Sequence, residues 1–190
     1  TQLSRVQIGS GDFVNSSKLV NQVHQGASEI SSLKLHIFDN SSLCPLAVRG
    51  EVKKIELQEK EKIGLIVIDY LQLMSSDLPI KDRRLEIESI SRGLKVLAQD
   101  LEVPVLVLSQ LSRNLERRTD KRPIMADLRE SGSIEQDAES IFFLYRDAVY
   151  NEEADPALAE AIIAKQRDGE TAVVPLRFEG AITSFDDWRH

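Results

Sequence analysis

Gly64-Leu-Ile-Val-Ile-Asp-Tyr-Leu-Gln-Leu-Met74 begins as an uninterrupted aliphatic run and turns acidic at Asp69. A short β-branched apolar run of this kind is typical of a strand that is buried on both faces, as in a parallel sheet. The carboxyl ends of such strands line the ligand crevice in open α/β sheets, so Asp69 is expected to face a site. One carboxylate there can hold a hydrated Mg²⁺; the alternative is a core strand that ends in a solvated aspartate.

The whole chain has the composition of a soluble globular protein. It has 190 residues, of which 42% are hydrophobic and 29% are charged, and its net charge is −7. No run approaches the ~18 apolar residues that a membrane span requires, and the single cysteine, Cys44, excludes an internal disulfide. We therefore expect one intracellular α/β domain in a reducing compartment. The acidic balance argues against a protein that coats nucleic acid generally, but it leaves a local basic track open.

Hydrophobic periodicity predicts an alternation of helices and strands. Helical spacing recurs in three segments: 15–29, 45–55 and 87–101. Apolar strand patterns occur in four segments: 34–38, 65–69, 103–108 and 141–145. Ser133-Ile-Glu-Gln136 has the spacing of a capping box that opens a short helix, whereas residues 1–13 are expected to be irregular. Residues 159–165 and 172–178 are expected to form a hairpin that turns at Asp168-Gly169. This order predicts a mostly parallel sheet flanked by helices, followed by a C-terminal hairpin.

Two polar residues follow neighbouring apolar strands. Asp69 closes the first strand and Gln110 closes the strand at 103–108, with one predicted crossover helix between them. A right-handed βαβ unit brings both strand ends to the same edge of the sheet. An acid for a metal ion and an amide for a phosphate or a water is a recurring pair in the hydrolysis of nucleoside triphosphates. The alternative is that both strands simply end in solvated polar residues.

A long basic segment, residues 111–132, follows the second strand. It contains six cations: Arg113, Arg117, Arg118, Lys121, Arg122 and Arg129. Because the segment is long for a connection inside a compact domain, it is either functional or disordered. Its arginines, placed before a helix N-terminus, could grip a phosphate backbone, and the lack of aromatic residues argues against base stacking. The alternative is a solvated loop whose charges pair with one another.

A second pair of cations, Lys165 and Arg167, lies just before the predicted hairpin turn. Their spacing places both side chains on the same side of an extended segment. The acids close to them in the sequence are Asp168 and Glu170. Such a pair could reach an anion that another subunit supplies, as an arginine finger does. Two surface cations before a turn are the alternative.

Taken together, these segments resemble the RecA-like motor domain of the replicative DnaB-type DNA helicases. The resemblance is strongest over residues 63–185 and looser over 1–62, and we expect the whole of 1–190 to be one partial ATPase domain. Six strings carry it, in family order: Ile66–Met74, Val107–Arg113, Lys121–Pro123, Asp127–Ala138, Leu144–Asp147 and Ile163–Gly169. The Asp127–Ala138 string is highly specific, and it argues against a recombinase or a clock-type ATPase of the same fold.

The resemblance implies a role for each matching residue. Asp69 corresponds to the acid that holds Mg²⁺ through water, and Gln110 to the residue that senses the γ-phosphate of ATP. Arg129, Glu130 and Gly132 correspond to the central-channel loop that follows single-stranded DNA. Lys165 and Arg167 correspond to the cations that reach the nucleotide of the neighbouring subunit, with Arg167 as the finger. The resemblance thus implies an ATP-driven helicase that acts as a homohexamer with primase and a helicase loader, without a membrane. It implies the bacterial cytoplasm and replisome, or a plastid stroma for an organellar gene.

The sequence departs from the family in one respect that matters. It contains no Gly-x-x-x-x-Gly-Lys-Ser/Thr phosphate loop, and Gly9-Ser-Gly11 cannot replace one. We therefore expect a C-terminal part of the motor, truncated at its N-terminal side, that hydrolyses no ATP alone and exposes apolar sheet edges. The competing hypothesis is a paralogue that binds DNA or joins rings without hydrolysis.

Overall fold

The computed structural model describes residues 5–11, 14, 16–40, 43–128 and 132–188. Its helices are α1 (Arg5–Ser10), α2 (Ser17–Ser31), α3 (Pro45–Glu59), α4 (Arg83–Leu101) and α5 (Gly132–Asp137). Its strands are β1 (Ile66–Ile68), β2 (Val105–Val107), β3 (Ser140–Tyr145), β4 (Leu158–Gln166), β5 (Ala172–Glu179) and β6 (Ser184–Asp187). The chain divides into two compact units: residues 40–143 with 162–172, and residues 1–39 with 144–161 and 173–190.

The core of the first unit is built on α4, the helix that its apolar stripe predicted. Ile87 and Ile90 are fully buried, and Leu94, Leu97 and Leu101 continue the same face. The helix begins after Asp82, whose Oδ1 accepts hydrogen bonds from the backbone N–H groups of Arg84 and Leu85. These bonds satisfy two of the amide donors that a helix N-terminus leaves without partners.

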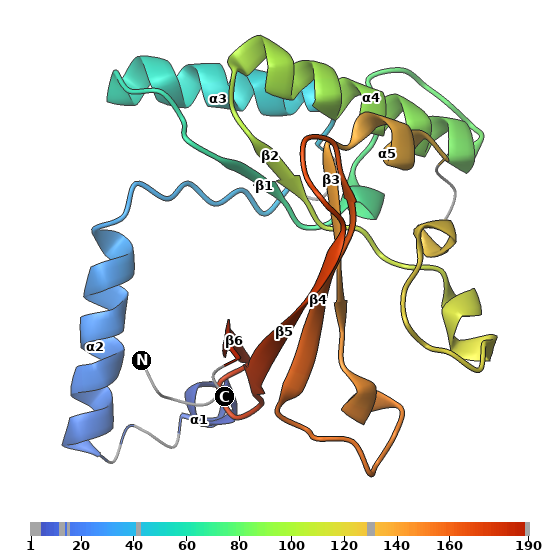
Figure 1. The fold of residues 1–190 in the computed structure, drawn as a ribbon. Coiled ribbons are helices and arrows are strands. Elements are labelled where there is room, and N and C mark those ends of the chain that lie inside the picture. The colour runs from blue at the N-terminus through green and yellow to red at the C-terminus, as the bar shows by residue number, and fades with distance from the viewer. Residues whose placement is uncertain (1–4, 12–13, 15, 41–42, 129–131, 189–190) are drawn as a thin grey trace. The chain divides into compact units, whose positions relative to one another are not determined.

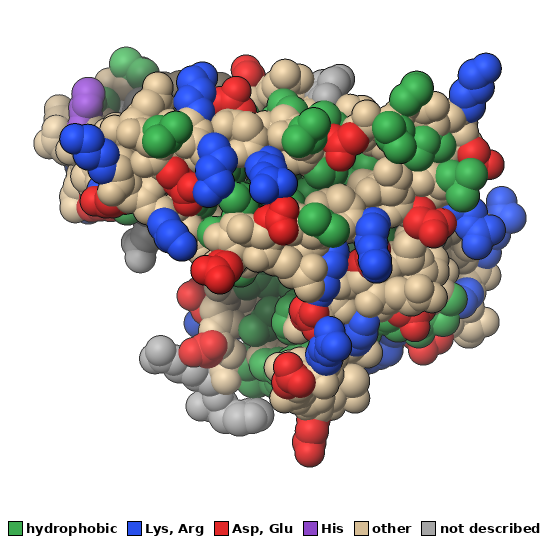
Figure 2. Space-filling model, turned by 90° about the horizontal axis from the view of Figure 1, so that it is seen from above, with side chains coloured by type: hydrophobic (Ala, Val, Ile, Leu, Met, Phe, Trp, Pro, Cys, Tyr) green, Lys and Arg blue, Asp and Glu red, His purple; other side chains and the backbone are tan. Residues whose placement is uncertain are grey.

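Helices α3 and α4 lie side by side and cover one face of the β1–β2 pair (Figure 1). Val48 and Val52 of α3 join the buried cluster, as the helical spacing of this segment predicted. Pro45 occupies the first turn of α3, where its missing N–H costs no hydrogen bond. The face drawn in Figure 2 carries Lys and Arg side chains interspersed with Asp and Glu, as on a solvated surface.

The pair β1–β2 is parallel, with Ile68 opposite Val107, but it is buried on one face only. Ile66 points into the core, whereas Val67 and Leu106, which are paired in register, are 53% and 51% exposed. The prediction of a strand buried on both faces is therefore wrong for the described chain. The apolar run is continuous, but α3 and α4 cover only one side of the pair, and run length alone does not distinguish these cases.

The third strand does not extend the parallel pair. Strand β3 belongs to a second sheet of four strands in the order β3-β4-β5-β6. The predicted hairpin is present as β4 and β5, with its turn at residues 167–169. Strand β6, which the sequence analysis did not predict, pairs antiparallel with β5 and places Phe185 opposite Phe178.

Three local predictions fail. Residues 34–38 form no strand, and Ile37 is 80% exposed, because no described strand pairs with this alternating segment. Residues 5–10 are helical rather than irregular, and the turn comes at Gly11, whose φ of 72° suits glycine. The predicted short helix is present as α5, but it begins at Gly132, so Ser133 lies inside the helix and is not its N-cap. The buried Oγ of Ser133 has no hydrogen-bond partner among the described residues.

The second compact unit contains a small aromatic cluster. The guanidinium of Arg146 lies 3.6 Å from the centroid of the Phe178 ring, and the rings of Phe178 and Phe185 are 5.0 Å apart. The Tyr145 hydroxyl donates to Asp147 at 2.6 Å. In the part of the chain that the structure describes, no helix is long and apolar enough to cross a membrane.

Candidate functional site

The ends of β1 and β2 meet at one edge, as the crossover argument predicted. Leu108 N donates to Ile68 O at 2.9 Å, and Leu71 N donates to Leu108 O at 2.8 Å, so the pairing continues past both strands. The side chains of Asp69 and Gln110, which follow these ends, are exposed. Neither side chain has a hydrogen bond or ion pair with a described residue in this structure, so both are available to a ligand.

Gln72 ties the two strand ends together, and sequence reasoning missed it. Its Nε2 donates to Ser109 Oγ at 3.0 Å, and its Oε1 accepts from Gln110 N at 3.1 Å. Arg83, the first residue of α4, donates to Gln72 O at 2.7 Å and holds this turn from behind. Gln72 lies three residues after Asp69, so its position just beyond the strand could have marked it as part of the site.

At the edge of the β1–β2 pair, a metal ion would find one carboxylate ligand, that of Asp69. No group of three or more His, Cys, Asp or Glu side chains is placed to hold a metal ion within the described ranges. A Mg²⁺ ion needs no such group, since it commonly keeps several waters and binds one or two carboxylates together with substrate phosphates. The exposed Asp69 carboxylate fits this pattern.

The basic segment after β2 is ordered by one ion pair. Arg118 Nη2 lies 2.9 Å from Asp127 Oδ2, and the Asp127 side chain is 7% exposed. The same Nη2 donates to Arg122 O at 2.6 Å, while Ser112 N donates to Asp127 O at 2.8 Å. An isolated bridge between Leu111 and Leu128 closes the base of the segment. Arg118 is therefore structural, in line with the self-paired alternative.

Two further cations of the basic segment and the three residues that the resemblance assigns to DNA binding lie along the same stretch of the chain. Arg113 and Arg117 are exposed on a short 3₁₀ helix over Arg113–Arg117. Arg129 and Glu130 lie outside the described residues. Gly132 is the first residue of α5. The assignment of Arg129, Glu130 and Gly132 to DNA binding therefore stays a prediction.

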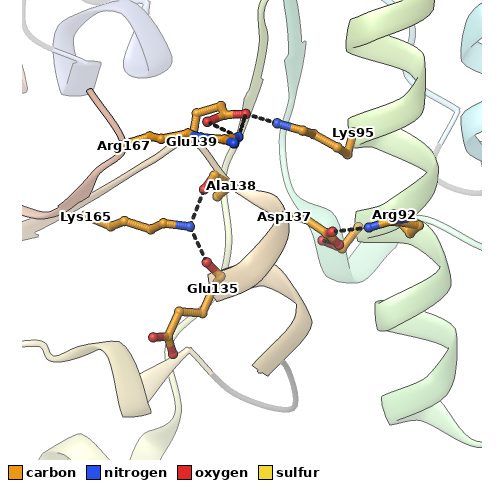
Figure 3. Close-up of polar contacts among 9 residues, drawn as sticks. Arg92, Lys95, Glu135, Asp137, Ala138, Glu139, Lys165 and Arg167 are labelled. Atoms are coloured by element: carbon orange, nitrogen blue, oxygen red, sulfur yellow. Dashed lines mark hydrogen bonds and ion pairs between the residues drawn. The ribbon is translucent and has the colours of Figure 1, made fainter. Parts of the chain in front are cut away.

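Lys165 and Arg167 both contact the segment that joins α5 to β3 (Figure 3). Lys165 Nζ donates to Glu135 O at 2.6 Å and to Ala138 O at 2.7 Å, carbonyls at the C-terminal end of α5. Arg167 Nη1 donates to both carboxylate oxygens of Glu139, at 3.0 and 3.2 Å. Both cations thus have intramolecular partners in this chain.

Glu139 is the acid that sequence spacing did not supply. It precedes β3, and Arg167 follows β4; because these strands are neighbours, the two residues meet at the sheet end. Arg167 N also donates to Glu139 O at 3.0 Å. The signal that could have found Glu139 is the register between β3 and β4, which requires knowing that these two strands pair.

A third cation, Lys95 of α4, completes this cluster. Its Nζ donates to Glu139 Oε1, and the hydrogen bonds from Lys95 first and Arg167 second lower the pKa of Glu139 below the usual glutamate range. The stabilisation is therefore present above the ordinary glutamate pKa, and it is lost as pH falls through the lowered folded-state pKa. A pocket of about 370 Å³ opens beside the pair, lined by Glu139, Ser140, Gln166, Arg167 and Asp168.

Residues 1–187 match the model of the family described as DnaB-like helicase C terminal domain. The chain belongs to this family. It is 45% identical over 183 residues to the replicative DNA helicase DnaB of Buchnera aphidicola subsp. Acyrthosiphon pisum, covering 96% of the chain and 38% of that protein. It is 52% identical over 154 residues to DnaB of Pasteurella multocida, covering 80% of the chain and 33% of the relative. The chain thus spans about a third of the length of these relatives.

Two solved structures share the fold. One is the structure of an ATPase domain, with a TM-score of 0.92 and 36% identity, covering 98% of this chain and 66% of that one. The other is a DnaB-like replicative helicase, studied for its interactions with primase. It has a TM-score of 0.91 and 36% identity, covering 98% of this chain and 46% of that one. These matches confirm the RecA-like α/β class of the DnaB-like domain.

Proposed function

We propose that this segment belongs to an ATP-dependent replicative DNA helicase, which unwinds duplex DNA by translocating on single-stranded DNA as a homohexameric ring. The observation that carries the proposal is the β1–β2 edge of a DnaB-like domain, where the exposed Asp69 and Gln110 follow paired strands. In this proposal residues 1–190 are part of a RecA-like ATPase domain. The protein acts in the bacterial cytoplasm at the replisome, or in a plastid stroma, with primase and a helicase loader as partners.

At the strand edge, Asp69 would hold Mg²⁺ through water, and Gln110 would sense the γ-phosphate of ATP. The ion would neutralise the charge that develops on the phosphate oxygens. The parallel register of β1 and β2 supports these roles, because it places both residues at one sheet edge. Gln72, which bonds Ser109 and the backbone of Gln110, keeps the second strand end in place.

At the other two places, cations would meet DNA and a neighbouring nucleotide. Arg129, Glu130 and Gly132 would form the loop that follows the DNA backbone, with Arg129 as the direct cation and Gly132 offering its backbone N–H. Lys165 and Arg167 would reach the nucleotide bound by the adjacent subunit, with Arg167 as the finger. A finger supplied in trans requires the ring.

The test is ATP hydrolysis by the longest natural chain that contains this segment, with and without single-stranded DNA. We expect DNA to stimulate hydrolysis and Arg167→Ala to reduce the stimulated rate by at least ~10³-fold, as loss of an arginine finger does. Asp69→Asn should abolish hydrolysis at low millimolar Mg²⁺. A matched control is Arg177→Ala, an exposed arginine on β5 that pairs only with Glu179 among the described residues.

The alternative is a DNA- or ring-binding paralogue without hydrolysis. A Gly-Lys-Ser/Thr phosphate loop encoded upstream of these residues would support the motor, whereas a true start near Thr1 would support this alternative. Undiminished binding of single-stranded DNA with no turnover would support this alternative over the motor. DNA-stimulated turnover that is unaffected by Arg167→Ala would instead leave a motor without a finger at this position.

A further inference from the structure

The Arg167 guanidinium is already hydrogen-bonded to the Glu139 carboxylate in this structure. Only Nη1 of its guanidinium contacts Glu139, and this nitrogen reaches both carboxylate oxygens. Nε and Nη2 form no hydrogen bond with any residue that the structure describes, and the Arg167 side chain is 68% exposed. An arginine has five N–H donors in a planar fork, so three donors remain for an anion.

Glu139 is itself fixed from the opposite side by α4. Lys95, whose side chain is 21% exposed, bonds the carboxylate, and Figure 3 shows Glu139 between Lys95 and Arg167. Ser91 Oγ donates to Asp137 Oδ2 at 2.8 Å, and Arg92 Nη1 lies 3.3 Å from Asp137 Oδ1. The segment that carries Glu139 is therefore attached to α4 at Asp137 and again at Glu139 itself.

The net charge of the side chains around Glu139 is positive, so the cluster attracts an anion. Glu139, and Asp168 beside Arg167 in the pocket lining, contribute two negative charges, whereas Lys95, Lys165 and Arg167 contribute three positive ones. A carboxylate that merely neutralised Arg167 would oppose phosphate binding. Here the second and third cations leave the cluster positive, so the carboxylate can orient Arg167 without cancelling the attraction.

We propose that Glu139, held by Lys95, is a positioning residue that aims the Arg167 guanidinium at the nucleotide of the neighbouring subunit. The inference rests on the proposed function and extends it to residues that do not touch the nucleotide. Long arginine side chains have many rotamers, and a hydrogen bond to one nitrogen restricts them before the anion arrives. The benefit should be seen in the transition state, where the finger acts.

The test uses the complete protein as a ring, with DNA-stimulated ATP hydrolysis as the readout. Glu139→Ala should lower kcat by about 3- to 10-fold, the size expected for loss of an exposed charge-assisted hydrogen bond. The KM for ATP should change by less than about twofold, because binding of nucleotide relies on other groups. Glu139→Asp, which keeps the charge, should recover part of the lost rate. Lys95→Met should lower kcat in the same direction and by less.

A double variant separates positioning from a general structural role. If Glu139 acts through Arg167, then Glu139→Ala added to Arg167→Lys should slow hydrolysis no further than Arg167→Lys alone. Glu88→Gln is the control: Glu88 is an exposed glutamate two turns before Lys95 on α4, and its substitution should leave kcat unchanged. Melting temperatures of all variants should stay close to that of the wild type.

The outcomes distinguish this inference from the proposed function. Hydrolysis lost in Arg167→Ala but unchanged in Glu139→Ala overturns the positioning role and leaves the motor standing. Additive losses in the double variant also overturn it, since they show that Glu139 acts independently of the guanidinium. Hydrolysis undiminished in Arg167→Ala overturns the finger itself, and the positioning role with it.

Discussion

At the scale of single residues, Arg118 stabilises the basic segment, residues 111–132, through its ion pair with Asp127. Asp127 is 5% exposed, and its carboxylate accepts hydrogen bonds from Arg118 Nη2 and from Ile124 N, both at 2.9 Å. A buried carboxylate that loses its cation keeps the cost of its own desolvation. Arg118 thus offsets the desolvation cost of burying the Asp127 carboxylate.

We expect Arg118→Met to lower the free energy of unfolding by about 1–3 kcal/mol, below the ~3–5 of a fully buried pair, because the arginine is partly solvated. Urea denaturation at low protein concentration measures this. Arg117→Met removes a neighbouring exposed arginine and should cost less than ~0.5 kcal/mol. Equal effects of the two substitutions would show that Asp127 does not depend on Arg118.

At the scale of the elements, α4 is the helix on which the first unit is built. Its start depends on Asp82, since Oδ1 accepts from Arg84 N at 2.9 Å and from Leu85 N at 3.1 Å. Asp82→Ala should lower the free energy of unfolding by about 1 kcal/mol, within the usual ~0.5–2 kcal/mol range for a lost N-cap. Asp82→Asn keeps the acceptor and should be nearly neutral. A neutral Asp82→Ala, measured by urea denaturation, would contradict the capping role.

Elements with strong local signals were predictable, and elements that depend on distant partners were not. The stripe from Ile87 to Leu101 and the turn at residues 167–169 follow from local spacing, and the structure contains both. Residues 34–38 alternate as a strand does, but alternation supplies no neighbour to complete the ladder. Burial of Val67 on a second face likewise depends on what covers the sheet, which no local pattern specifies.

The same limit applies to the candidate site. The common edge of Asp69 and Gln110 follows from one βαβ connection, so the sequence predicted it correctly. The contact between Glu139 and Arg167 depends on the pairing of β3 with β4, two strands that are separated by a loop and a short helix. Residue types and spacing could suggest a finger, but not the carboxylate that holds it.

For the molecule as a whole, the open face of β1–β2 has a consequence in solution. Leu65, Val67, Leu106 and Leu108 are 52%, 53%, 51% and 43% exposed, and Val67 and Leu106 are neighbours across the pair. Contiguous apolar surface of this kind favours association. We expect the purified 190-residue chain to self-associate as its concentration rises, which sedimentation velocity measures.

The double variant Val67→Thr, Leu106→Thr tests whether the exposed β1–β2 face causes the self-association. Threonine suits a strand but removes much of the apolar surface, so association should weaken without loss of the fold. Leu57→Gln is the control, because Leu57 is 80% exposed on α3 and lies away from this face. A wild-type chain that stays monomeric at every concentration would contradict the expectation.

The last prediction concerns catalysis by these 190 residues alone. The sequence contains no Gly-x-x-x-x-Gly-Lys-Ser/Thr segment, so it lacks the backbone cradle and the lysine that hold the β- and γ-phosphates. Purified chain should therefore release no phosphate from Mg²⁺-ATP, with or without single-stranded DNA, under the conditions used to assay the longest natural chain that contains it. Turnover that copurifies with the chain and disappears in Asp69→Asn would overturn this, because it would mean that the β1–β2 edge binds and activates ATP without a phosphate loop.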